Sequence, residues 1–208
     1  MRRRQVLTGA AALAALPAAG LAETPGPAPT AAPTPGVVKV ELTTGQGVMS
    51  VELFADKAPI SVANFLRYLD AKGFDGASFF RAATAPGAPQ IGLIQGHAKP
   101  GKLFAPVAHE STTLTGLRHK DGTLSLARRA QGTAQSDFFV CVGDAPYLDA
   151  DPKAEGDNAG FAAFGHVTAG MDVARKILAM PRSATLGGEE MKGQMLDPPV
   201  PIISAKRV

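Results

Sequence analysis

The chain has few of the residues and motifs on which metal sites and covalent enzyme mechanisms depend. One cysteine, Cys141, occurs among its 208 residues, so no internal disulfide can form. The four histidines are scattered and make no ligand cluster with it; they are His97, His109, His119 and His166. A nucleophile elbow, a His-Glu-x-x-His motif and a phosphate-binding loop are all absent. We therefore expect no metal and no cofactor, and histidines that act as surface or core hydrogen-bonding residues.

An excess of one charge is also missing from most of the chain. The formal net charge of +3 comes from Arg2, Arg3 and Arg4; without them the 21 basic residues fall to 18, which equals the number of acidic residues. No basic stripe with interleaved aromatic residues appears in the sequence. The basic isoelectric point therefore gives no reason to expect a nucleic-acid partner.

Long apolar runs are absent beyond the first residues. Residues 6–16 are apolar and rich in alanine, follow a charged start, and are too short to span a bilayer. Gly20 and Ala22 supply the small residues of a cleavage site, so residues 1–22 are predicted to be a secretory signal peptide. We expect a periplasmic or secreted protein with no membrane anchor.

The other N-terminal features concern the export route and the start of the folded domain. Arg3 and Arg4 suit a twin-arginine signal, although paired arginines also occur in ordinary secretory signals, so both routes stay open. Residues 23–36 are mostly Pro, Ala, Thr and Gly and are predicted to form a disordered tether. Residues 37–208, roughly 170 in number, suit one domain with a core of its own.

Alternating apolar and polar residues predict several strands in this domain. The alternation runs through residues 37–43 and again through residues 48–54, with a glycine-containing turn at residues 45–47 between them. This pattern is typical of a hairpin. Short apolar runs separated by Gly, Pro and Asp follow, and residues 201–205 are predicted to be a closing strand.

Two stretches have helical spacing instead. Apolar residues recur at intervals of three and four over residues 59–72, where Gly73 ends the pattern, and over residues 171–180, where Pro181 ends it. Many short strands with two helices predict a mainly β fold, a closed antiparallel barrel capped by the two helices.

Two segments are predicted to be loops. Residues 82–90 contain little besides Ala, Pro and Gly, and residues 149–160 are acidic and small. The second resembles a calcium loop but lacks the spaced ligands and terminal Glu of an EF-hand, so a solvated acidic loop is the default and calcium the alternative. Cys141 lies in the apolar run 138–142 and is expected to be a small buried core residue, not a reactive thiol.

Several short motifs occur in an order that matches a known family. They are ASFFR at residues 77–81, IQG at 94–96, GTLSLAR at 122–128, SDFFVC at 136–141, YLD at 147–149 and FAAFG at 161–165. In this order the chain resembles the cyclophilins, which are prolyl cis/trans isomerases built on a small β-barrel. The resemblance runs from about Val38 to Arg207, and Tyr147 and Phe161 resemble the bacterial exported branch of that family.

The implied reaction fits the absences noted above. Turning an X–Pro bond faces a barrier of ~18–20 kcal/mol because the amide is partly double-bonded. The catalyst needs no nucleophile, metal or acid–base pair. It needs an apolar pocket for the proline ring and a donor that binds the twisted amide better than the planar one.

The resemblance also implies a role for each matching residue. Arg81 would hydrogen-bond the prolyl nitrogen as it pyramidalises, and Gln95 would help to place the arginine and the substrate backbone. Leu93, Phe139 and Leu148 would line the proline pocket, and the backbone of Ala127 would meet the substrate. The predicted catalytic residues are thus Arg81 and Gln95; the predicted substrate-binding residues are Phe80, Leu93, Ala127, Phe139, Tyr147, Leu148 and Phe161.

The chain departs from the family pattern in and around this pocket. Phe80 replaces the usual histidine before the arginine, Tyr147 the usual tryptophan, and Phe161 another histidine. The loop between Arg81 and Gln95 is longer than usual. Gly92 stands where the family has a pocket phenylalanine, which predicts a missing wall that Phe161 or Ile91 would have to refill.

The sequence therefore favours one function and leaves two alternatives. We expect a monomeric peptidyl-prolyl isomerase that acts on proline-containing segments of unfolded or partly folded exported proteins. The first alternative, favoured by Gly92, is a chaperone-like module of the same fold that binds such segments with weak or no turnover. The second is a small-ligand barrel of another family, which would have its pocket deep inside the barrel.

Overall fold

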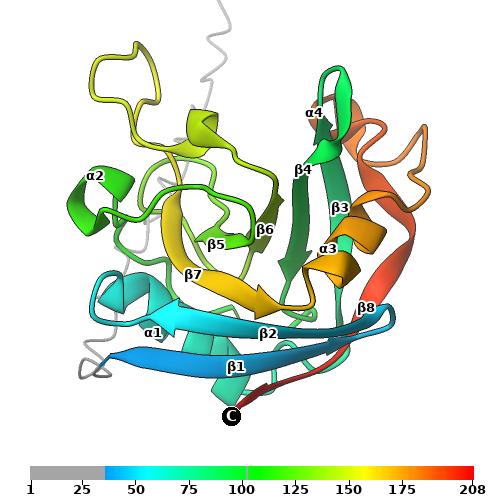
Figure 1. The fold of residues 1–208 in the computed structure, drawn as a ribbon, viewed down its shortest axis with the longest axis horizontal. Coiled ribbons are helices and arrows are strands. Elements are labelled where there is room, and N and C mark those ends of the chain that lie inside the picture. Colours follow the sequence, from blue (N-terminus) through cyan, green and yellow to red (C-terminus); the bar gives the residue numbers. More distant parts are fainter. Residues whose placement is uncertain (1–35, 102) are drawn as a thin grey trace, which may run out of the picture.

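The computed structural model describes residues 36–101 and 103–208 (Figure 1). The predicted signal peptide, and all of the predicted tether except Gly36, therefore lie outside the described residues. Within the described part of the chain, no helix is both long enough and apolar enough to cross a membrane.

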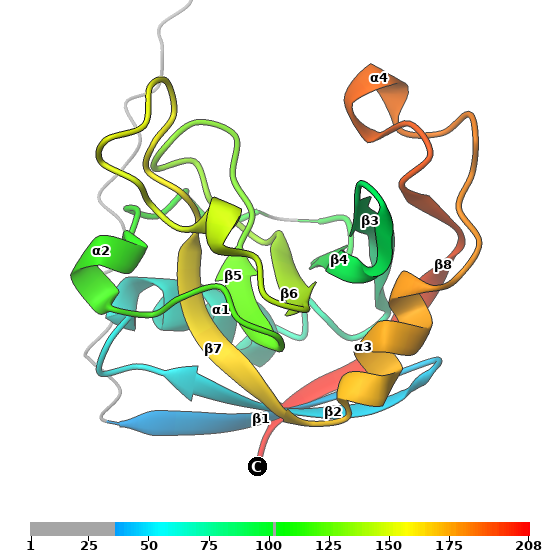
Figure 2. The same ribbon diagram turned by 45° about the horizontal axis from the view of Figure 1, so that its top comes forward.

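Eight strands close into an antiparallel barrel, which confirms the predicted architecture (Figures 1 and 2). Around the barrel the order is β1-β2-β7-β5-β6-β4-β3-β8. The strands are β1 Val37–Thr44, β2 Gly47–Phe54, β3 Ala77–Ala85, β4 Ala88–His97, β5 Thr123–Leu126, β6 Phe138–Val142, β7 Ala162–Ala169 and β8 Met195–Arg207.

The first hairpin forms as the alternation predicts. Val40 and Leu42 of β1 and Val51 of β2 are buried, while the residues between them are more exposed. Gly47 opens β2 at φ +136°, and a Cβ there would lie 2.7 Å from Cγ2 of Val173. The turn therefore needs glycine because it packs directly against a helix.

The two predicted helices are present as α1, Pro59–Asp70, and α3, Met171–Leu178. Each ends two residues earlier than the spacing predicts, after Asp70 and after Leu178. α1 packs against β2, β7 and β8, whereas α3 packs against β2, β3, β4 and β6. In both views they lie at different ends of the barrel (Figures 1 and 2).

A buried carboxylate completes the start of α1. The backbone N–H groups of Ile60 and Ser61 donate to the two oxygens of Glu110 at 3.1 and 2.7 Å. Such groups lack partners within the helix, and a negative charge there also complements the helix dipole. Three short elements were not predicted: α2 Thr112–Thr115, the 3-10 helix η1 Pro146–Leu148 and α4 Gly188–Met191.

The prediction of a loop at residues 82–90 was wrong. β3 continues to Ala85 and β4 begins at Ala88, so most of this segment is a tight hairpin turned at Gly87, which has φ +73°. Ladder pairing between Ala83 and Leu93 holds the two strands together. Small residues have low strand propensity, but propensity in sheets yields to the pairing context. The closing strand is likewise longer than predicted, because β8 spans Met195–Arg207.

Phenylalanine rings fill the interior of the barrel. Phe65, Phe74 and Phe138 have ring centroids 4.7 to 5.3 Å apart, and Phe79 and Phe164 complete the group at 5.6 and 5.5 Å from Phe138 and Phe65. Each of these side chains is at most 1% exposed. Burial of each contributes about 1.5–3 kcal/mol of hydrophobic free energy. A barrel filled in this way does not support the small-ligand alternative, which needs a pocket inside it.

Candidate active site

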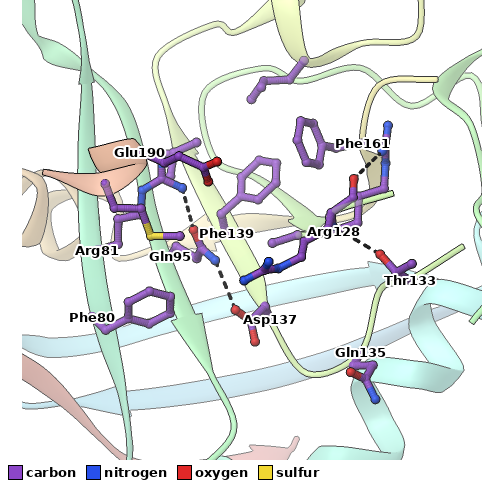
Figure 3. Close-up of a pocket in the computed structure, with 15 residues that line it drawn as sticks. Phe80, Arg81, Gln95, Arg128, Thr133, Gln135, Asp137, Phe139, Phe161 and Glu190 are labelled. Carbon is purple, nitrogen blue, oxygen red and sulfur yellow. Dashed lines mark hydrogen bonds between the residues drawn. The ribbon is translucent and has the colours of Figure 1, made fainter. Parts of the chain in front are cut away.

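A cavity of about 750 Å³ lies on the outer face of the barrel, beside β3, β4 and β6 (Figure 3). Strand alternation explains its position. Ile94, Phe138 and Val140 point into the core, and the residues that alternate with them, such as Gln95 and Phe139, face the cavity.

All of the predicted site residues except Tyr147 line this cavity. They are Phe80, Arg81, Leu93, Gln95, Ala127, Phe139, Leu148 and Phe161. Tyr147 belongs to η1 beside Leu148, but its side chain is 66% exposed and does not line the cavity. The structure thus brings together residues from six separate segments of the chain and leaves one predicted contact outside.

A β-bulge puts two consecutive residues of β3 on the cavity side. Phe79 pairs with Gly96 and Arg81 with Gln95, so Phe80 is an extra residue in the ladder. Phe79 and Ala82 are both fully buried in the core, while Phe80 and Arg81 line the cavity. Bulges re-aim side chains in this way, and strict alternation would have sent one of the two inward.

Arg81 is held by two glutamine side chains. Its Nη1 donates to Oε1 of Gln95 at 2.9 Å, and its Nε and Nη2 donate to Oε1 of Gln194 at 2.8 and 2.6 Å. Burial lowers the pKa of the Arg81 guanidinium from its ordinary value, yet arginine stays protonated at neutral pH. Both partners are neutral, so the positive charge is oriented without being cancelled.

Asp137 fixes the orientation of the Gln95 amide (Figure 3). Nε2 of Gln95 donates to Oδ2 of Asp137 at 3.2 Å, while Oε1 of the same amide accepts from Arg81. An ionised carboxylate only accepts hydrogen bonds and a guanidinium only donates them. The amide therefore satisfies both neighbours in one of its two flipped orientations only.

The apolar floor of the cavity is a cluster separate from the barrel core. Phe139, Cys141, Ala145 and Leu148 are buried in it, and Leu93, Ala127 and Phe161 pack against it. The rings of Phe139 and Phe161 meet edge to face at 5.5 Å. The expectation that Cys141 is a small buried residue is confirmed, since it is fully buried beneath this floor.

Phe139 rests on a buried polar network. The imidazole of His119 stacks on its ring at 5.9 Å, with Nδ1 2.7 Å from Oδ1 of Asp149 and Nε2 3.0 Å from Oγ of Ser125. Burial lowers the pKa of His119, although the hydrogen bond and charge of Asp149 oppose that shift. Serine, histidine and aspartate are the residues of a hydrolytic triad, but Ser125 is fully buried and cannot meet a substrate. The network supports the pocket floor instead.

Gly92 does not open the cavity as predicted. It does not line the cavity, and a Cβ built on it would overlap the carbonyl oxygen of Ala83 on β3. The position is thus closed by the neighbouring strand of the longer hairpin. The cavity has other apolar side chains, namely Phe80, the predicted Phe161, and Met191 of α4; Ile91 is not among them.

Sequence reasoning missed several residues that line the cavity. They are Arg128, Arg129, Thr133, Gln135, Asp137, Glu190 and Met191. Asp137 could have been found, because it lies two residues before Phe139 and therefore on the same face of an extended segment. Glu190 and Met191 carry no such signal, since they reach the site through a short helix far along the chain.

The acidic loop at residues 149–160 is tied to the cavity wall by Arg128. This guanidinium donates to both carboxylate oxygens of Asp157, at 2.6 and 2.8 Å, and to the carbonyl of Gly160. The Arg128 hydrogen bond lowers the pKa of Asp157. No group of three or more His, Cys, Asp or Glu side chains suited to a metal ion occurs in residues 36–101 and 103–208.

These features define what the cavity can do chemically. It offers a rigid apolar floor and, in the same cavity, an oriented cation with unused N–H donors. Such a site can hold a proline ring and donate a hydrogen bond to an amide nitrogen whose lone pair appears as the bond twists. It requires no covalent intermediate.

Comparison with known sequences gives matches along the whole barrel. The family model described as cyclophilin type peptidyl-prolyl cis-trans isomerase/CLD matches residues 39–207. A peptidyl-prolyl cis-trans isomerase of Acinetobacter baylyi is 36% identical over 173 residues, which are 80% of this chain and 84% of that protein. Peptidyl-prolyl cis-trans isomerase A of Dickeya dadantii is 37% identical over 140 residues, covering 66% of this chain and 70% of its own length.

Solved structures agree on the fold. The crystal structure of a cyclophilin type peptidyl-prolyl cis-trans isomerase of Cryptosporidium parvum superposes with a TM-score of 0.63 at 18% identity, over 83% of this chain and 98% of that one. A second structure of that protein, in the presence of the dipeptide Ala-Pro, gives a TM-score of 0.62 at 18% identity over 82% and 98%. At this identity the likeness concerns the fold alone.

Proposed function

The chain belongs to the family of cyclophilin-type peptidyl-prolyl cis-trans isomerases, and we propose that it assists the folding of exported proteins. Its reaction is rotation about X–Pro bonds, which takes tens to hundreds of seconds without a catalyst. Its substrates are proline-containing segments of unfolded or partly folded chains, in which such bonds are accessible. Its place of action is the periplasm or the extracellular space.

Arg81 is the proposed catalytic residue, and its setting is the observation that carries the proposal. The guanidinium lines the same cavity as the Phe139 ring (Figure 3). A proline ring seated on Phe139, Leu93 and Leu148 would present its nitrogen to this donor. The nitrogen gains a lone pair as the amide twists, so the hydrogen bond is stronger in the transition state than in the planar ground state.

Gln95 and Ala127 serve the substrate backbone in this proposal. Gln95 holds Arg81 on one side and is itself held by Asp137. The N–H of Ala127 already donates to the carbonyl of Asp137 at 2.9 Å. The carbonyl of Ala127 is therefore the group that accepts a hydrogen bond from a bound peptide.

Protease-coupled isomerisation of a proline tetrapeptide tests the role of Arg81. We expect Arg81→Ala to lower kcat/KM by about 10²–10³, the usual loss for one donor aimed at transition-state charge. Stability should change little, because no buried apolar volume beyond the aliphatic stem is lost. Full activity of Arg81→Ala at unchanged stability would contradict the assignment.

The export proposal rests on residues 1–22 and has its own test. The charged start, apolar run and small residues fit a secretory signal. Mass spectrometry of the envelope fraction should find a chain that begins at Glu23. An intact Met1 on the mature protein argues against export. Replacing Arg3 and Arg4 by Lys should block export if the route is twin-arginine, whereas unchanged export indicates the general route.

The chaperone-like alternative has lost the observation that favoured it. It rested on a pocket wall missing at Gly92, but that position faces the backbone of Ala83 and is not part of the cavity. A wild-type rate close to the uncatalysed background would revive it.

A further inference from the structure

A segment that comes late in the chain lies beside the candidate catalytic arginine. α4 and the residues after it lie beside the β3–β4 end of the barrel (Figure 2). The backbone carbonyl of Gln194 accepts from the N–H of Ala82 at 2.8 Å, and Met195 pairs with Arg81 in the β3–β8 ladder. The backbone of Gln194 is thus fixed next to Arg81.

The side chain of Gln194 binds the flank of the guanidinium opposite to Gln95. Its Oε1 accepts from Nε and Nη2 of Arg81, whereas Gln95 accepts from Nη1. A guanidinium has five N–H donors. Three are used in these contacts, so one N–H on each terminal nitrogen remains for a substrate.

The chemistry of this contact suits orientation. An arginine side chain has many rotamers, and two fixed acceptors on opposite flanks select one of them. No carboxylate among the described residues forms an ion pair with Arg81, although Glu190 lines the same cavity. A neutral amide therefore orients the cation and leaves its charge available.

We propose that Gln194 is a positioning residue, which holds the Arg81 guanidinium so that its two remaining N–H groups point into the cavity. The proposal rests on the catalytic role proposed for Arg81. It makes the segment after α4 part of the active site, although nothing in the local sequence around Gln194 points to the cavity.

Two measurements on the mature protein test this role. In Gln194→Ala we expect kcat for a proline tetrapeptide to fall about tenfold, with KM changed less than threefold, because the apolar floor that binds the ring is intact. The second measurement is the NMR signal of the Arg81 Nε–H group, assigned by its absence in Arg81→Ala. It should be visible in the wild type and broadened by solvent exchange in Gln194→Ala, since its acceptor is gone.

Two further variants separate positioning from a merely structural role. Gln194→Glu keeps an acceptor oxygen at the same reach but partly neutralises Arg81, so the Nε–H signal should return and kcat should lie between those of Gln194→Ala and the wild type. Lys192→Ala, an exposed neighbour outside the cavity, should leave both readouts unchanged.

The possible outcomes are distinguishable. An unchanged kcat or an unchanged Nε–H signal in Gln194→Ala overturns the proposal, and so does a Glu variant no more active than the Ala variant. If Arg81→Ala itself keeps full activity, the proposed role of Arg81 fails first. If Arg81→Ala loses activity but Gln194→Ala keeps it in full, the catalytic role of Arg81 stands and only the positioning role of Gln194 is overturned.

Discussion

Gly92 on β4 lies so close to Ala83 on β3 that its α-carbon has no room for a side chain. A Cβ at position 92 would overlap the Ala83 carbonyl oxygen and would lie 2.9 Å from Cα of Thr84. Both obstacles are backbone atoms, which cannot rotate away as a flexible side chain can. The extended hairpin and the glycine therefore depend on each other.

Substitution of Gly92 should destabilise the protein without improving its pocket. Gly92→Ala must push the two strands apart, and forced overpacking of this kind typically costs about 1–3 kcal/mol. For a chain of this size each kcal/mol lowers Tm by about 2–4 °C. Thermal unfolding measures the effect, and Gly92→Phe should lower Tm further with no gain in kcat/KM.

Gly87→Asn is the matched control for this prediction. It lies at the turn of the same hairpin with φ +73° and has nothing within 4 Å of an added Cβ. Asparagine tolerates this backbone conformation, so Tm should change little. If Gly92→Phe were as stable as the wild type and more active, the cavity would have lacked a wall after all.

Removing the Asp137 carboxylate should lower the rate through Gln95. Without that acceptor the Gln95 amide is free to flip, and Arg81 then faces an N–H group for part of the time. We expect Asp137→Ala to reduce kcat by about two- to tenfold, the equivalent of one hydrogen bond of about 0.5–1.5 kcal/mol. Asp137→Asn keeps one acceptor oxygen, so its kcat should fall less than that of Asp137→Ala. The tetrapeptide assay gives both values.

Asp144→Asn provides the comparison for a lost carboxylate elsewhere. Asp144 binds Lys120 on the surface, and neither residue lines the cavity. The Asp144→Asn variant should therefore catalyse isomerisation at the wild-type rate. Equal rates for Asp137→Ala and the wild type would show that Gln95 holds Arg81 without help.

The predictable part of the fold is the part with a clear periodicity. The hairpin of β1 and β2 and the two long helices follow from spacings of two and of three to four residues. The β3–β4 hairpin has only small residues between Ala82 and Gln90, so its stability comes from pairing that the sequence does not display. Pro198 and Pro199 argue against a strand ahead of the predicted closing strand at residues 201–205, yet β8 includes them.

The predictable part of the site is the part carried by family motifs. Arg81, Gln95 and Phe139 lie in short segments that match, and each lines the cavity. The bulge that turns both Phe80 and Arg81 outward depends on pairing with two other strands, so no local pattern reveals it. The contact of Gln194 with Arg81 spans 113 positions along the chain and follows only from the closed barrel.

The thiol of Cys141 should be unreactive in the folded protein. Burial, aided by the charges of Asp149, Asp121 and Asp144, raises its pKa to about 12. The thiolate is the reactive form, so almost none is present at pH 8. Iodoacetamide at that pH should leave the native protein unmodified in mass spectra and alkylate it fully in denaturant. Rapid labelling of the native protein would show that the pocket floor opens.

Protonation of His119 should link acidification to loss of stability. Burial lowers its pKa in the folded state, so below the ordinary value of 6.5 the unfolded chain binds a proton more readily than the folded one. The neutral imidazole therefore makes its full contribution to the free energy of unfolding above pH 6.5. That contribution is lost as the pH falls from there through the lower pKa of the folded state. Denaturant unfolding at several pH values between 7 and 5 measures this effect. The free energy of unfolding should decline more steeply with falling pH in the wild type than in His119→Gln. The comparison concerns the two slopes, so it holds whatever the absolute stability of the variant. Parallel profiles would mean that His119 charges as readily beneath Phe139 as it does in the unfolded chain, and that Asp149 offsets its burial.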